Sequence, residues 1–114
     1  MATTLRNRKH PSIRVPLSQE IETRDDIFGS LGIGWNLFKE ENYERAFNHL
    51  YLASKCGNYF ARYLLGRFYE FGLVDNIDYN MACKYYSSVY ANTTHPFLKS
   101  EAERGIQRII SKIE

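Results

Sequence analysis

Two similar pentapeptides, 36 residues apart, constrain the fold of this chain more than any other feature of its sequence. They are Asn42-Tyr43-Glu44-Arg45-Ala46 and Asp78-Tyr79-Asn80-Met81-Ala82. In both, a polar residue suited to a helix N-cap precedes an aromatic residue and a small alanine. Two helices approach closely only where a side chain is short, so Ala46 and Ala82 predict the same contact in two helix hairpins. A fixed period of this length is typical of repeat proteins, whose units pack against their neighbours.

The spacing of apolar residues predicts five helices, at about 25–40, 43–56, 59–71, 79–91 and 96–112. Asn42, Asn58 and Asp78 are expected N-caps, and Gly57 and Gly72 are expected to end the second and third helices. The last helix is expected to bury an edge made of Ile106, Ile109, Ile110 and Ile113. No alternating apolar pattern of strand length occurs, so the sequence predicts an all-α domain over 25–114 that follows a tail at 1–24.

Two further motifs lie in the second predicted hairpin. The segment Ala61-x-x-x-Leu65-Gly66-x-x-Tyr69-x-x-Gly72 resembles the first helix of a Sel1-like repeat, and Asp78-Tyr79-x-x-Ala82-x-x-Tyr85-Tyr86 resembles its second helix. The upstream hairpin, with Gly34, Ala46 and Ala53, is closer to a tetratricopeptide repeat. The resemblance covers about 31–90, although Val74 and the pair Val89-Tyr90 depart from the family pattern. It implies a short right-handed α-solenoid of two helix hairpins plus a C-terminal capping helix; the alternative is an unrelated helical bundle.

The basic residues are unevenly distributed. Four of the 15 basic residues (Arg6, Arg8, Lys9 and Arg14) and none of the 13 acidic residues lie in positions 1–19, so the rest of the chain has a net charge of −2. The tail fits three interpretations: a disordered arm, a mitochondrial targeting segment, or a docking arm for an acidic partner or nucleic acid. The whole chain's net charge of +2 is too small to indicate nucleic acid, and the folded part is slightly acidic, so nucleic acid is an improbable partner for it.

The cysteines bear on the compartment. Cys56 and Cys83 form no CxxC pair, and both fall in predicted helices, so we expect buried, reduced thiols in an intracellular protein. The chain has no apolar run of membrane-spanning length and no hydrophobic secretion signal. A cytoplasmic location is therefore expected, with a mitochondrial one as the alternative.

Catalytic and ligand-binding patterns are missing from the sequence. It contains no phosphate-binding loop, no HExxH and no GxSxG motif. His10, His49 and His95 lie far apart without a second ligand at useful spacing. We therefore expect no enzyme activity, no cofactor and no metal, and we interpret Gly29, Gly32 and Gly34 as positions of close helix contact.

The resemblance also implies where a partner binds. In stacked helix hairpins the first helices line one curved face, and ligands usually lie along it. The candidate partner-binding residues on that face are Trp35, Phe38, Lys39, Tyr63, Arg67 and Glu70. Tyr63 and Arg67 are expected to be exposed, whereas Trp35 also fits a core position. A clamp for a C-terminal carboxylate is improbable, because Leu31 and Trp35 occupy two of the clamp positions.

These expectations lead to one main function hypothesis. The chain is a non-catalytic protein–protein interaction adaptor, or scaffold, that binds a peptide or protein surface on its first-helix face. Two alternatives stay open: a self-associating assembly subunit, possibly mitochondrial, and a tail-mediated binder of an acidic partner or nucleic acid.

Overall fold

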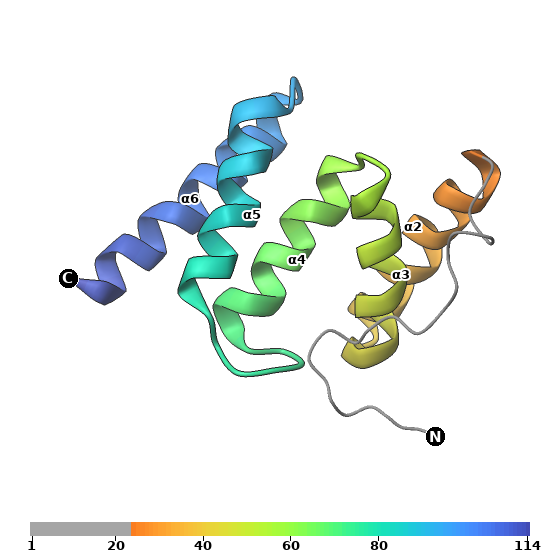
Figure 1. Ribbon diagram of the computed structural model, residues 1–114, viewed down its shortest axis with the longest axis horizontal. Coiled ribbons are helices and arrows are strands. Elements are labelled where there is room, and N and C mark those ends of the chain that lie inside the picture. Colours follow the sequence, from red (N-terminus) through yellow and green to blue (C-terminus); the bar gives the residue numbers. More distant parts are fainter. Residues whose placement is uncertain (1–23) are drawn as a thin grey trace.

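The computed structural model describes the backbone of residues 24–114 and the side chains of residues 29–114. The described residues form five α-helices: α2 (Arg24–Lys39), α3 (Tyr43–Lys55), α4 (Tyr59–Phe71), α5 (Tyr79–Asn92) and α6 (Pro96–Ile113). Each helix packs against the next one along the chain, and α4 also contacts α6. Figure 1 shows the helices following one another across the molecule, from α2 at one end to α6 at the other.

The described part of the chain is all-helical, as the sequence predicts. Every helix boundary lies within one residue of its expected place, and no strand occurs in residues 24–114. The tail at 1–23, and with it the three interpretations of its basic residues, lies outside the described residues, as do the side chains of Asp25 and Phe28. None of the described helices is long and apolar enough to cross a membrane.

Short turns set the helix ends by local hydrogen bonding. The Asn58 side chain accepts a hydrogen bond from the backbone N–H of Ala61 at 2.8 Å, and Asp78 accepts one from Met81 at 3.0 Å, which confirms both as N-caps. Gly72 ends α4 in the left-handed conformation, at φ 63°. Asn42 also occupies an N-cap position, but its side chain makes no capping hydrogen bond.

The two hairpins share the same close contacts. Ala46 and Ala82 are both 0% exposed, and each stands fourth in the second helix of its hairpin. A Cβ atom added to Gly34 of α2 would lie 2.8 Å from Leu50 of α3, and one added to Gly66 of α4 would lie 2.6 Å from Tyr86 of α5. Leu50 and Tyr86 are 36 residues apart, the period of the pentapeptides. In each hairpin a glycine of the first helix therefore faces a large side chain of the second helix, although Gly34 and Gly66 are 32 rather than 36 residues apart.

The three N-terminal glycines differ in their surroundings. Gly34 makes the close helix contact that the sequence predicts, whereas a Cβ atom at Gly29 or Gly32 would meet nothing within 4 Å. The interpretation of close contact is therefore correct for Gly34 and wrong for the other two.

Helix α6 buries a different stripe from the one expected. Leu98, Ala102, Gly105 and Ile109 face the rest of the protein, and Ile106 is half-buried. The expectation was wrong for Ile110 and Ile113, which are 43% and 64% exposed. Both residues lie in the last turn of α6, and Ile113 follows the buried Ile109 by four residues, so it continues the buried stripe at the end of the helix.

The two cysteines are more accessible than expected. Cys56 is exposed, because it forms the C-cap of α3 at the turn before Gly57. Cys83 is half-buried in α5, and burial raises the pKa of its thiol, with the nearby Glu70 carboxylate adding to the effect. The prediction of a buried Cys56 was therefore wrong.

A buried polar cluster ties α4, α5 and α6 together. The Glu70 side chain is 0% exposed and receives two hydrogen bonds from the Arg108 guanidinium, both 2.9 Å long. The Tyr86 hydroxyl donates a third, at 2.6 Å. Burial by itself raises the pKa of Glu70, but the hydrogen bonds from Arg108 and Tyr86 outweigh it and leave the pKa below its ordinary value of 4.5. Glu70 is therefore an ionised carboxylate whose role is structural.

Candidate binding groove

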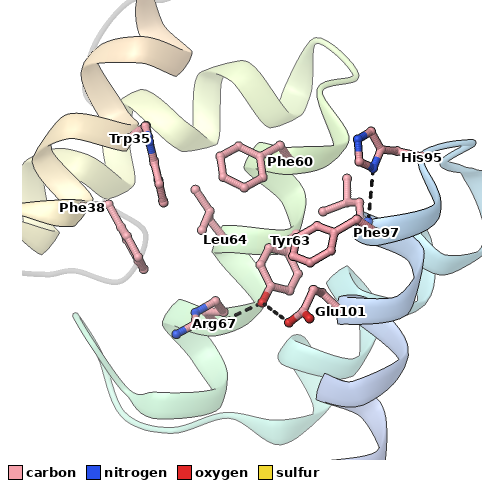
Figure 2. A pocket seen from close by; sticks show the side chains of 10 residues that line it. Trp35, Phe38, Phe60, Tyr63, Leu64, Arg67, His95, Phe97 and Glu101 are labelled. Carbon is pink, nitrogen blue, oxygen red and sulfur yellow. Dashed lines mark hydrogen bonds between the residues drawn. The ribbon is translucent and has the colours of Figure 1, made fainter.

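A groove with a volume of about 540 Å³ lies along one face of the protein. Its lining comes from α2, from α4 and from the start of α6, while α3 and α5 contribute nothing to it. The lining residues are Trp35, Phe38, Phe60, Tyr63, Leu64, Arg67, His95, Phe97, Leu98 and Glu101. Figure 2 shows Trp35 and Phe38 on one side, Phe97 and His95 on the other, and the α4 residues between them.

Aromatic rings form most of the groove wall on the α2 and α4 side. The ring of Trp35 lies 5.1 Å from that of Phe60 in an edge-to-face contact and 5.8 Å from that of Phe38 in a stacked contact. Phe60 in turn stacks beside Tyr63. Such pairs hold one another in fixed orientations, so this wall is a rigid apolar surface.

The opposite wall begins at the turn before α6. His95 occupies the N-cap, where its Nδ1 accepts a hydrogen bond from the backbone N–H of Leu98 at 3.3 Å. Pro96 follows in the first turn, where its fixed φ fits and its missing N–H costs nothing. This start places Phe97 at the groove with 66% of its surface exposed. Its exposed ring extends the apolar lining of the groove to this rim.

The polar side of the groove is a chain of three residues. Arg67 donates a hydrogen bond to the Tyr63 hydroxyl at 3.1 Å, and that hydroxyl donates to the Glu101 carboxylate at 3.5 Å. Figure 2 shows this chain running from α4 to α6 across the lower part of the groove. The guanidinium of Arg67 also lies over the rings of Tyr63 and Phe71, at 5.9 and 5.5 Å. These contacts hold the charged group in place beside an apolar surface.

The structure brings four of the six sequence-derived candidates together. Trp35, Phe38, Tyr63 and Arg67 all line the groove. Lys39 does not line it, but its ammonium lies 5.4 Å from the centre of the Trp35 ring. Tyr63 is buried rather than exposed, because it packs beneath the groove floor against Tyr86.

The expectation that Glu70 is available to a partner was wrong. Glu70 follows Tyr63 and Arg67 on α4, but its carboxylate turns toward α6 and is covered by Arg108 and Tyr86. Helical spacing places Glu70 on the same face of α4 as Arg67, but α6 packs over its carboxylate and removes it from the groove.

Sequence reasoning missed the other groove residues, among them Phe60, His95, Phe97 and Glu101. None of these four residues was assigned a role in binding from the sequence. The only signal in the sequence is that Phe97 follows Pro96 directly and lies outside the apolar stripe of its helix. That signal indicates an exposed aromatic residue but not which helix it faces.

The described residues offer no place for a metal ion. No group of three or more His, Cys, Asp or Glu side chains in this part of the chain could hold one.

Comparison with protein-family models, with curated proteins and with solved structures finds no match to this chain. The function is therefore inferred from the geometry of the groove.

Proposed function

We propose that this protein is a non-catalytic adaptor that binds a segment of another polypeptide in the groove between α2, α4 and α6. The observation that carries the proposal is the groove itself. It is largely apolar, walled by aromatic rings and bordered by the exposed Phe97. Its volume of about 540 Å³ falls in the range of about 300–1,000 Å³ that is usual for specific binding sites.

The repeated hairpin packing supports a second element of the proposal. We propose that the chain is a short right-handed α-solenoid of the Sel1-like and tetratricopeptide kind. In such a stack the first helices line one face, and the groove draws its lining from α2, α4 and α6. Ala46 with Ala82, and Leu50 with Tyr86, are the pairs that support this reading.

A partner gains most by covering the aromatic rim. Burying a phenylalanine side chain stabilises a complex by about 1.5–3 kcal/mol, and Phe97 is the most exposed aromatic residue of the groove. Trp, Tyr and Arg are the residue types most often found at the energetic centre of interfaces, and Trp35, Tyr63 and Arg67 meet here.

The test replaces Phe97 by serine and compares proteins that co-purify with the full chain from its native cells. Phe97→Ser is expected to lose the specific partner, with at least a tenfold loss of affinity for it, because about 1.4 kcal/mol corresponds to tenfold. Helix content and melting temperature are expected to stay unchanged, since the side chain makes few contacts. Ile113→Ser is the matched control: this residue is 64% exposed on the same helix but lies outside the groove. Equal retention of every partner by both variants would argue against the groove as the binding site.

Self-association is the second candidate function, because Ile110 and Ile113 leave apolar surface exposed at the C-terminal end of α6. If α6 pairs with a second copy, light scattering should give a dimer mass at micromolar concentration, and Ile113→Ser should restore the monomer. A monomer mass for the wild-type chain over that range would exclude this candidate.

A further inference from the structure

The charge of Arg67 is not matched by a carboxylate within residues 29–114. Its only hydrogen-bond partner in that part of the chain is the Tyr63 hydroxyl, which is uncharged. The two ion pairs of the described residues join Arg104 to Glu101 and Arg108 to Glu70. Arg67 is half-buried, and its Nε lies buried without an acceptor. A guanidinium in these surroundings has lost part of its hydration without gaining a charged partner, which makes an incoming anion favourable.

Glu101 does not supply the missing negative charge. Its carboxylate lies on the far side of the Tyr63 hydroxyl and pairs with Arg104 at 3.4 Å. Arg67 and Arg104 therefore share the single carboxylate of Glu101, while the nearby Arg108 is paired with Glu70, so one positive charge is left over. Lys39, over the Trp35 ring, adds a further positive charge on the α2 side. The groove is apolar in its walls and positive at the end where Arg67 lies.

We infer that the groove selects a peptide segment that carries an aspartate or glutamate beside a bulky apolar side chain. The apolar side chain lies against Trp35, Phe60 and Phe97, and the carboxylate accepts hydrogen bonds from the Arg67 guanidinium. The planar guanidinium suits a carboxylate because two parallel N–H groups can bind its two oxygens. This inference rests on the proposed function, since it names the chemistry of the partner for the same groove.

The first 19 residues of the chain do not fit this chemistry. Positions 1–19 contain four basic residues and no acidic residue, so they offer Arg67 no carboxylate. Glu20 and Glu22 flank Ile21 and lie outside the side chains that the structure describes, so the occupant that we propose, an acidic segment of another protein, rests on the charge and the apolar lining of the groove.

A peptide-display selection on the immobilised full chain tests the inference. Random heptapeptides with a capped C-terminus are selected against the wild-type chain and against three variants: Arg67→Gln, Phe97→Ser and Arg45→Gln. Arg45→Gln is the matched control, because it removes the same charge from an exposed position on α3 outside the groove. Wild-type protein and Arg45→Gln are expected to enrich peptides with an acid next to an aromatic or aliphatic residue. Arg67→Gln should lose the acid preference while keeping the apolar one.

The best selected peptide is then titrated into each protein to measure the affinity. The fluorescence of Trp35, the single tryptophan, reports binding in the groove. Replacing the acidic residue of the peptide by glutamine should weaken binding about tenfold, and so should Arg67→Gln in the protein. Making both changes together should weaken binding little more than either change alone.

Three outcomes would overturn the inference. If the selected peptides are apolar without an acidic residue, and Phe97→Ser no longer selects them, the groove is still the binding site but the inferred preference for an acidic partner is wrong. A tenfold loss that Arg45→Gln shares would mean that only the overall charge matters. The proposed function would also be contradicted if no selected peptide loses binding in Phe97→Ser, or if the protein without peptide forms a dimer that buries Trp35.

Discussion

Replacing Arg108 by methionine is expected to lower the free energy of unfolding by about 3 kcal/mol. The change leaves the Glu70 carboxylate fully buried with one hydrogen bond, from Tyr86, in place of three. Removing one partner of a buried ion pair typically costs about 3–5 kcal/mol, and the partial exposure of Arg108, 38% for its side chain, places the value at the lower end. Urea unfolding at pH 7, followed by circular dichroism, measures the difference.

Two variants and a pH series check that the loss comes from the buried charge. Arg104→Met removes an arginine from the same helix, but its ion pair with Glu101 is largely exposed, so it should cost no more than about 0.5 kcal/mol. Replacing the whole cluster, with Glu70→Leu, Arg108→Met and Tyr86→Phe together, should recover most of the stability, since no polar group then stays buried without a partner.

The effect should also depend on pH with a defined sign. The pKa of Glu70 is lower in the folded protein than in the unfolded chain. The ionised carboxylate therefore contributes to the free energy of unfolding above its ordinary pKa of 4.5, and this contribution is lost as the pH falls below that value. In Arg108→Met, protonation of Glu70 relieves the buried charge. Because burial without Arg108 raises the pKa of Glu70, the difference in unfolding free energy between wild type and variant should begin to narrow above pH 4.5 and narrow further below it. A difference that is constant from pH 7 to pH 4 would contradict this account.

Adding one methyl group at Gly66 is expected to be nearly as damaging. A Cβ atom there would lie 2.6 Å from the Tyr86 ring, and the opposite edge of that ring faces Gly105. Tyr86 is 0% exposed and its hydroxyl is fixed by Glu70, so the ring has no free direction in which to move. Gly66→Ala and Gly105→Ala should each lower the free energy of unfolding by about 2–3 kcal/mol, despite the better helix propensity of alanine.

The same substitution at Gly32 provides the control, because nothing lies within 4 Å of a Cβ atom there. Gly32→Ala should leave stability unchanged or raise it by up to about 1 kcal/mol through helix propensity. In a background of Tyr86→Leu, which shortens the obstructing side chain, Gly66→Ala should cost clearly less than in the wild type. If Gly66→Ala and Gly32→Ala have equal effects, the close approach of α4 to Tyr86 does not limit stability.

The candidate site could be predicted in part. Trp35, Phe38, Tyr63 and Arg67 were identified because the resemblance to stacked helix hairpins implies that a partner lies along the first helices, and all four line the groove. Glu70 was misplaced by the same reasoning, because its face of α4 also meets α6. Phe97 and Glu101 were missed because the turn at 93–95 sets the direction of α6, and no residue pattern reports that direction.

Local patterns in the sequence determined the helices and their ends. Apolar spacing, the caps at Asn58 and Asp78 and the glycine at position 72 act over a few residues, so they can be read without knowing the rest of the chain. The contacts across α4, α5 and α6 were decided only by the tertiary structure. Glu70 meets Arg108 across 38 residues of sequence, Tyr86 lies between Gly66 and Gly105, and Ile113 stays in solvent because no described helix covers it. Which polar side chain is buried, and which apolar one is left exposed, depends on how helices distant in sequence pack, and that packing also forms the groove.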